Sequence, residues 1–92
     1  MCGIFGKIST KPITNLPQCV DSLNKLSHRG PDDSGTWISD RYNVFLGHRR
    51  LSIIDLTNSA KQPMQDDSNR YVIVFNGEIY NYIELREEFK KL

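Results

Sequence analysis

Apolar positions along the chain recur at two different periods, and together they predict four or five strands and two helices. Residues 2–9, with Ile4 and Ile8 among their apolar positions, are predicted to form a first strand. A helix follows, whose apolar residues are three and four positions apart on one face: Leu16, Val20, Leu23 and Leu26. Cys19 lies near this stripe and is expected to pack in the core, and Gly30 suits the position just past the helix.

The middle of the chain predicts a polar loop and then a hairpin. Residues 28–35 are dense in turn residues and carry more polar side chains than a turn requires. Residues 36–39 and 44–48 read as two paired strands joined by a turn at 40–43. A short strand is expected after Gln62-Pro63, followed by a turn at 66–69.

The strongest predicted strand is 71–75, an unbroken run of β-branched and aromatic residues that is typical of burial on both faces. Beyond it, Asn81 suits a helix N-cap, with Glu84 three residues later. Four apolar residues then share one helical face: Tyr82, Leu85, Phe89 and Leu92. The elements indicate an α+β fold, and the end of the pattern in mid-helix leads us to expect a fragment of a larger domain.

Composition bounds the chemistry without specifying it. The 92 residues allow at most one small domain, and a net charge of +1 gives no electrostatic case for nucleic acid or an anionic membrane. No apolar run reaches the length of a membrane span. Two cysteines make no disulfide framework, so a cytoplasmic location is expected. No metal site is expected, because His28 and His48 have no partners at ligand spacing.

Cys2 is the first candidate for chemistry. If Met1 is removed, Cys2 carries a thiol and a free α-amino group, and the reference pKa of such an amine, about 7.7–8.0, would leave part of it neutral near pH 7. The amine could then take the proton from the thiol and return it to a leaving amine. The ordinary alternative is that Cys2 is a small buried hydrophobic residue, and its position alone favours that alternative.

Two further pairs of residues are candidates for a binding site. Arg49 and Arg50 lie in a predicted strand and so point to opposite faces, where one guanidinium could bind a carboxylate; two solvated arginines are the interpretation that spacing favours. Asn76-Gly77 is typical of a hairpin turn. Because a helix and not a strand is predicted after it, its amide groups could also donate to an oxyanion.

Five blocks, in this order, resemble the N-terminal glutaminase domain of the glutamine-hydrolysing asparagine synthetases. They are residues 1–6 (MCGIFG), 28–35 (HRGPDDSG), 48–55 (HRRLSIID), 62–64 (QPM) and 75–81 (FNGEIYN). Those domains are class II amidotransferases with an N-terminal nucleophile. The resemblance implies the first half of a four-layer α/β/β/α sandwich with antiparallel sheets. Residues 1–92 would then be a partial amidotransferase domain, inactive or nearly so by itself.

The resemblance also implies a role for individual residues. Cys2 would be the nucleophile that hydrolyses L-glutamine to glutamate and ammonia, with Asn76 and Gly77 as oxyanion donors. Arg50 would bind the α-carboxylate and Glu78 the α-amino group of glutamine. The implied substrate-binding residues in full are Arg50, Leu51, Ser52, Ile53, Ile54, Asn76, Gly77 and Glu78.

The rest of such an enzyme is implied as well. A synthetase domain, absent from this chain, would use ATP and Mg²⁺ to amidate aspartate, and the parent enzyme could be a homodimer. No cofactor is implied for residues 1–92. Two alternatives stay open. One is an amidotransferase domain that serves another acceptor, and the other is a non-catalytic glutamine-binding or regulatory module.

Overall fold

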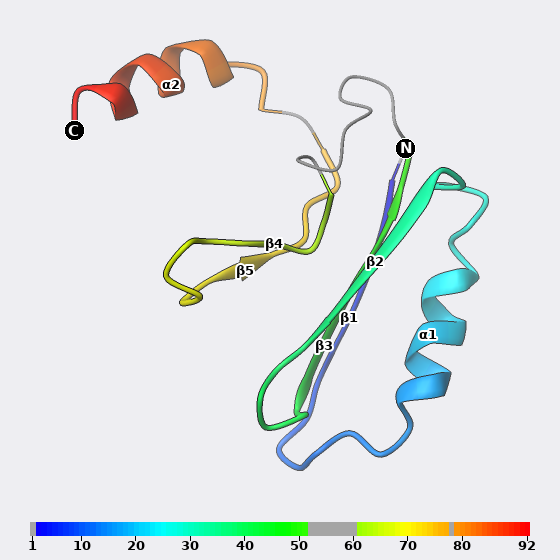
Figure 1. Ribbon diagram of the computed structural model, residues 1–92. Helices are drawn as coiled ribbons and strands as arrows, with labels where there is room; N and C mark the ends of the chain where they lie inside the picture. The colour runs from blue at the N-terminus through cyan, green and yellow to red at the C-terminus, as the bar shows by residue number, and fades with distance from the viewer. Residues whose placement is uncertain (1, 52–60, 78) are drawn as a thin grey trace.

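The computed structural model describes residues 2–51, 61–77 and 79–92, and it is built around a three-stranded antiparallel sheet (Figure 1). β1 (Gly3–Ile8) and β2 (Asp33–Ile38) both pair with the central strand β3 (Val44–Arg50). In this register Gly3 lies opposite Arg49, and Asp33 lies opposite Arg50. The predicted first strand and the predicted hairpin are therefore confirmed.

β2 begins three residues earlier than predicted. Asp33, Ser34 and Gly35 belong to the strand and pair with β3, although the sequence predicted a polar loop that extends to Gly35. An edge strand accepts such residues because one of its sides pairs with the sheet and the other can stay in contact with solvent. The loop before β2 is correspondingly shorter than predicted.

The helix α1 (Leu16–Asn24) covers one face of this sheet. Cys19 and Leu23 are 2% and 1% exposed, so the predicted core position of Cys19 is confirmed. Val20 was predicted to lie in the apolar stripe, but it is 39% exposed, because Cys19 and Leu23 are the pair four residues apart that faces the strands. The core cluster consists of Ile13, Cys19 and Phe45, with Phe5, Leu16 and Ile38 packed against it.

Gly30 does not cap the helix as predicted. α1 ends at Asn24, and several turns separate it from Gly30. Gly30 is buried against the backbone of Arg49, where a Cβ atom would overlap the Arg49 carbonyl group. Its lack of a side chain therefore serves close packing of this loop on β3.

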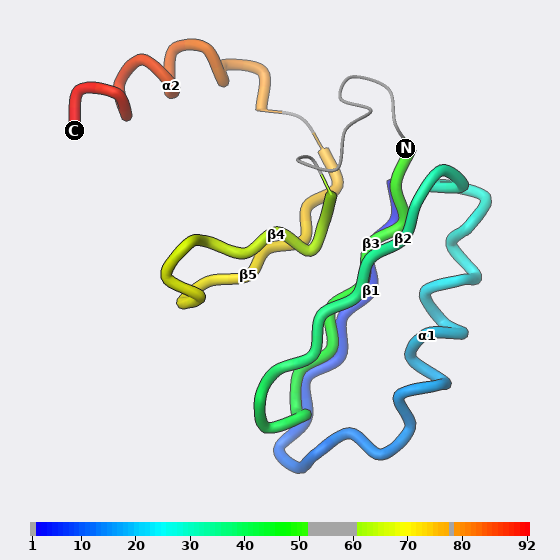
Figure 2. The backbone as a smooth tube through the Cα atoms, viewed as in Figure 1, coloured from blue at the N-terminus to red at the C-terminus, as the bar shows by residue number. Residues whose placement is uncertain are grey.

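A second, two-stranded antiparallel sheet lies on the side of the first sheet that is opposite α1 (Figure 2). β4 (Met64–Gln65) pairs with β5 (Val72–Ile73). The predicted turn between them is confirmed, and Asp66 organises it by accepting a hydrogen bond from the Tyr71 N–H at 2.8 Å. A hydrogen bond from the Ser68 hydroxyl group is the main reason that the pKa of Asp66 is lowered.

The prediction for residues 71–75 is only partly right. Of residues 71–75 only Val72 and Ile73 form a strand, and Tyr71 and Ile73 are 65% and 55% exposed rather than buried. β-branched and aromatic residues fit a pleated surface, but burial on both faces also needs elements that cover both faces. Here β5 pairs with the two residues of β4.

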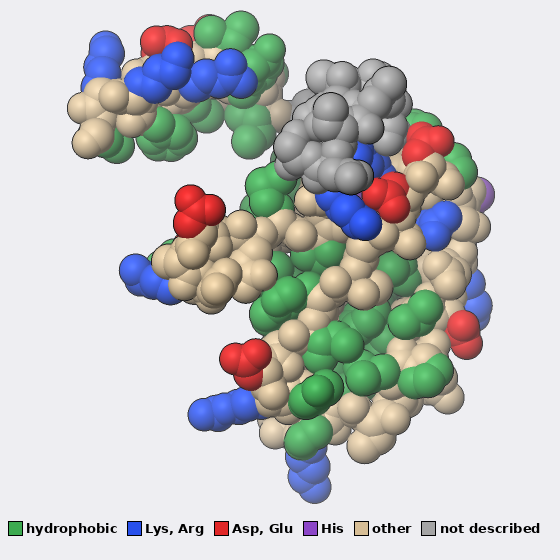
Figure 3. All heavy atoms as spheres, in the orientation of Figure 1, with side chains coloured by type: hydrophobic (Ala, Val, Ile, Leu, Met, Phe, Trp, Pro, Cys, Tyr) green, Lys and Arg blue, Asp and Glu red, His purple; other side chains and the backbone are tan. Residues whose placement is uncertain are grey.

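The helix α2 (Tyr82–Lys90) begins after Asn81, as predicted, although the Asn81 side chain makes no capping hydrogen bond. None of its residues is buried, and it stands apart from both sheets in Figures 1 and 2. Apolar side chains gather over the sheet beside the β4–β5 hairpin and along α2 (Figure 3). The fold is α+β with antiparallel sheets, and neither helix in the described part of the chain has the length and apolarity to span a membrane.

Candidate active site

Cys2 lies at the start of β1, beside the end of β3. Its Sγ atom accepts a hydrogen bond from the Leu51 N–H, with 3.4 Å between sulfur and nitrogen, and lies 4.0 Å from the Leu51 carbonyl oxygen. Because Gly3 pairs with Arg49, the strand ends bring Cys2 next to Arg50 and Leu51. The side chain is only partly buried, so the thiol is not a core residue of the kind that Cys19 is.

The loop before β2 holds this N-terminal segment in place. Arg29 donates a hydrogen bond from Nε to the Cys2 carbonyl oxygen, at 3.2 Å. Arg49 in turn donates from Nε to the Gly30 carbonyl oxygen at 3.0 Å. The polar residues that exceeded the needs of a turn are therefore used, in part, to position the backbone of Cys2.

Arg49 and Arg50 point to opposite faces of β3, as predicted, but they are not the two solvated arginines that spacing favoured. Arg50 is 7% exposed, whereas Arg49 reaches across the α1 face to the Asn24 side chain at 3.4 Å. A buried guanidinium has lost its water and is therefore strongly disposed to interact with an acceptor group. The structure thus selects Arg50 as the inward arginine.

His48 is a buried residue that the sequence reasoning used only to argue against a metal site. It is 2% exposed and lies on the same face of β3 as Arg50, two residues away. Burial lowers the pKa of His48 below its ordinary value, the Arg50 charge lowers it further, and the backbone of Phe75 acts in the opposite direction. Burial and the neighbouring guanidinium therefore favour the neutral form of the imidazole.

The Asn76-Gly77 pair lies after β5 and directly follows Phe75. The Phe75 N–H donates to the side-chain oxygen of Gln62 at 2.6 Å, and the Phe75 backbone lies by the His48 ring. The structure therefore brings Cys2, Arg50 and Leu51 together and connects Asn76-Gly77 to the same sheet face through Phe75. The predicted residues Ser52, Ile53, Ile54 and Glu78 lie outside the described residues.

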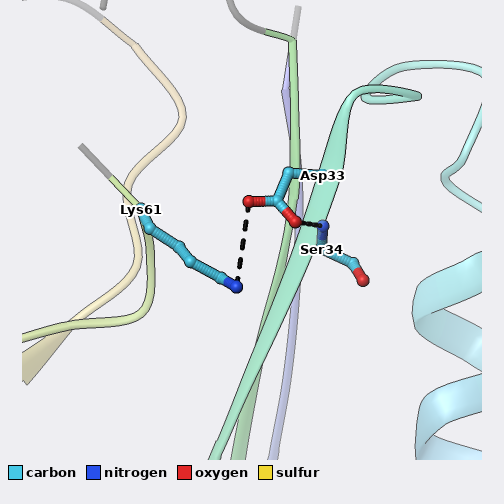
Figure 4. Close-up of polar contacts among 3 residues, drawn as sticks. All are labelled: Asp33, Ser34 and Lys61. Carbon is cyan, nitrogen blue, oxygen red and sulfur yellow. Dashed lines mark hydrogen bonds and ion pairs between the residues drawn. The ribbon is translucent and has the colours of Figure 1, made fainter. Parts of the chain in front are cut away.

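An ion pair joins the segment that begins at Lys61 to the three-stranded sheet. The Lys61 ammonium lies 3.8 Å from the Asp33 carboxylate, whose other oxygen accepts a hydrogen bond from the Ser34 N–H at 2.8 Å (Figure 4). Both ionic side chains are partly exposed, so the pair contributes little to stability, about 0–1 kcal/mol. Its value here is that it marks where the second sheet attaches to β2.

Comparison with known proteins identifies the kind of chain this is. A family model described as a glutamine amidotransferase domain matches residues 1–92. This chain belongs to the glutamine amidotransferase domain family. The amidotransferase chain is also 43% identical, over 98% of its length, to asparagine synthetase [glutamine-hydrolyzing] 1 of Bacillus subtilis.

Two other relatives are similar at the same level. Asparagine synthetase B [glutamine-hydrolyzing] of Escherichia coli is 41% identical over 97% of the chain, and an amidase named chry2 of Gibberella zeae is 42% identical over 98%. The amidotransferase chain spans only 14–16% of the length of these three relatives.

Among the described residues, no group of three or more His, Cys, Asp or Glu side chains could hold a metal ion. Beside Cys2 lie instead the buried Arg50 at the end of β3 and the backbone amide of Leu51, and the buried His48 lies on the same face of β3 as Arg50. Such groups can bind a carboxylate and donate hydrogen bonds.

Sequence reasoning gave no role to Arg29, His48 or Gln62. All three lie inside the blocks that carried the resemblance, which was a usable signal. The contacts of Arg29 with Cys2, and of His48 and Gln62 with Phe75, join residues that are distant in the sequence, and only the fold brings them together.

Proposed function

We propose that this chain is the glutaminase part of an enzyme that hydrolyses L-glutamine and passes the ammonia to an acceptor. The observation that carries the proposal is the partly buried thiol of Cys2 beside the buried Arg50, in a chain of the amidotransferase family. The completed domain is proposed to be a four-layer α/β/β/α sandwich, of which α1 and the two sheets would form three layers.

In the proposed reaction, removal of Met1 frees the α-amino group of Cys2, which takes the thiol proton. The sulfur bonds to the side-chain amide carbon of glutamine, and a tetrahedral oxyanion forms. The Asn76 side-chain amide and the Gly77 N–H donate to this oxyanion. The carbon–nitrogen bond then breaks as the amine returns the proton to the departing amide nitrogen, which leaves as ammonia, and water hydrolyses the γ-glutamyl thioester to glutamate.

Glutamine would be held mainly through its own charges. Arg50 would bind the α-carboxylate, because a guanidinium presents two parallel donors that match a carboxylate. Leu51, Ser52, Ile53 and Ile54 would shape the pocket, and Glu78 would bind the α-amino group. Removal of water from Arg50 makes this recognition stronger than it would be at an exposed arginine.

The acceptor is proposed to be aspartate, amidated with ATP and Mg²⁺ in a synthetase domain outside these residues. On the same resemblance, the parent enzyme is proposed to be cytoplasmic and able to form a homodimer. Support for aspartate comes from the relatives named asparagine synthetases. The similarly related amidase supports a second candidate, an amidotransferase that serves a different acceptor.

The first test uses the protein encoded by the complete reading frame. Intact mass before and after treatment with 6-diazo-5-oxo-norleucine, a glutamine-like electrophile, should reveal loss of Met1 and one adduct on Cys2. Release of ammonia from glutamine should fall to background in Cys2→Ala and persist in Cys19→Ala, the matched control in the core. Retention of glutaminase activity in Cys2→Ala would reject the proposal.

A further inference from the structure

Gln62 connects the second sheet to the first through two different parts of the same residue. Its backbone carbonyl oxygen packs on the Cα atom of Gly35 in β2, so closely that a Cβ atom at Gly35 would overlap it. Its side-chain oxygen accepts a hydrogen bond from the Phe75 N–H at 2.6 Å. Gln62 is thereby anchored on β2 and reaches the residue that precedes Asn76-Gly77.

Phe75 is held on more than one side. Its ring lies against Gly77, where an added Cβ atom would be 2.9 Å from the ring Cζ atom. Its backbone lies beside the buried ring of His48. The orientation of the peptide units that follow Phe75 therefore depends on contacts made by Phe75 itself, and the hydrogen bond from its N–H to Gln62 is a directional one.

Donors to an oxyanion accelerate a reaction only when they are already aimed at the position where the negative charge develops. A misplacement of about 1 Å can cost about 100-fold in rate. Asn76 and Gly77 follow Phe75 directly, so a change in the direction of the Phe75 peptide is passed on to both donors.

We propose that Gln62 is a positioning residue for glutamine hydrolysis, which by accepting the Phe75 N–H aims the Asn76 amide and the Gly77 N–H at the oxyanion. The inference rests on the glutaminase function proposed above. Gln62 itself would touch neither the substrate nor Cys2, so its loss should affect the chemical step more than the binding of glutamine.

The test compares three substitutions at Gln62 in the protein encoded by the complete reading frame. Gln62→Met is similar in size but has no amide oxygen to accept the hydrogen bond. Gln62→Asn keeps the amide but shortens the side chain by one methylene group, which moves the acceptor oxygen away from the Phe75 N–H. Gln62→Glu retains an acceptor oxygen at the original distance. The measurements are kcat and KM for glutamine, and the rate at which iodoacetamide alkylates Cys2, which needs no oxyanion donor.

We expect Gln62→Met and Gln62→Asn to lower kcat about 10- to 100-fold. KM and the alkylation rate should stay within about twofold of wild type, and Gln62→Glu should recover most of kcat. Wild-type kcat in Gln62→Met or Gln62→Asn would overturn the inference, and so would an equal loss of kcat in Gln62→Glu. If Gln62→Met does not fold, Gln62→Asn and Gln62→Glu still make the comparison. Absence of glutaminase activity in the wild-type protein would instead reject the proposed function.

Discussion

At the scale of single residues, the candidate site is defined by polar side chains that have lost contact with water. Arg50 and His48 are 7% and 2% exposed, although an arginine and a histidine are ordinarily at least partly solvated. Burial disfavours the charged form of the imidazole, whereas a guanidinium stays charged and must be balanced by acceptors. Substitutions of these two residues are therefore expected to have larger effects than substitutions of surface residues.

The first prediction concerns His48 and pH. Because the pKa of His48 is lower in the folded protein than in the unfolded chain, the unfolded chain takes up the proton first as the pH falls. The free energy of unfolding should therefore decrease as the pH drops below about 6.5, by at most about 1.4 kcal/mol per pH unit from this group.

Urea denaturation between pH 5.5 and 7.5 measures that slope. His48→Gln should flatten it. His28→Gln, which alters the other of the two histidines and lies at an exposed position, should leave it unchanged. An unchanged slope in His48→Gln would show that burial of this imidazole does not control the pH response.

The second prediction concerns Arg50. Arg50→Lys keeps the charge but loses the two parallel donors, so KM for glutamine should rise about 10- to 100-fold with a smaller change in kcat, which corresponds to about 1.5–3 kcal/mol. Steady-state kinetics measure this, with Arg49→Lys on the opposite face as the control. Equal effects of the two substitutions would exclude a specific role for Arg50.

At the scale of elements, close approaches of backbone to backbone position the second sheet. Gly35 is the contact point on β2, and Gln62 and Lys61 attach the following segment to that strand. α1 packs on the other face mainly through Cys19 and Leu23. The central strand β3 lies between β1 and β2, packs against α1, and carries the buried Arg50 at its end.

The third prediction is that Gly35→Ala destabilises the attachment of the second sheet while Gly6→Ala does not. A methyl group at Gly35 would overlap the Gln62 carbonyl oxygen, whereas one at Gly6 would lie 3.5 Å from the Leu46 side chain, an ordinary contact. Overpacking of this kind costs about 1–3 kcal/mol.

Thermal unfolding and glutaminase activity of the two variants measure the difference. Gly35→Ala should lose both stability and kcat, because the anchor of Gln62 is displaced. A Gly35→Ala protein as stable and as active as Gly6→Ala would mean that the second sheet does not depend on this contact.

The fourth prediction concerns the face of α1. Leu23→Ala should lower the free energy of unfolding by about 2–5 kcal/mol, because it opens a cavity beneath the helix. Val20→Ala, at an exposed position of the same helix, should cost less than about 1 kcal/mol. Chemical denaturation distinguishes the two variants. A larger decrease in the free energy of unfolding for Val20→Ala than for Leu23→Ala would mean that the Val20 face of α1, and not the Leu23 face, packs on the sheet.

At the scale of the whole molecule, much apolar surface is uncovered. The large exposed hydrophobic residues of the second sheet, α2 and the segment between them include Met64, Tyr71, Ile73, Phe75, Ile79, Tyr82 and Phe89. Extensive exposed apolar surface on a protein in water marks an interface or causes association. The chain spans only 14–16% of the length of the three relatives compared above, so further protein could cover this surface.

The fifth prediction follows for residues 1–92 expressed alone. They should bind a hydrophobic dye, associate as concentration rises and release little or no ammonia from glutamine. Dye fluorescence, sedimentation and an ammonia assay measure this, with the protein from the complete reading frame as the reference. A monomeric, dye-free and active 1–92 chain would contradict the expectation that these residues need further protein around them.

The sequence by itself determined the elements and the family. The first strand within residues 2–9, the hairpin of residues 33–50 apart from its early start, and the helix after Asn81 follow from local patterns, because the spacing of apolar side chains reflects the geometry of one strand or helix. Cys2, the Arg49-Arg50 pair and Asn76-Gly77 were identified as candidates from residue type and neighbours, and the resemblance carried by the five blocks chose Arg50.

Only the tertiary structure decided which face each residue serves and which distant residues meet. Arg50 is buried and Arg49 is not, Val20 is exposed, and residues 71–75 are largely uncovered, because burial depends on what packs against an element. The contacts of Arg29 with Cys2 and of Gln62 with Phe75 join positions 27 and 13 residues apart. No local pattern encodes such pairs, since their geometry exists only after the sheets have assembled.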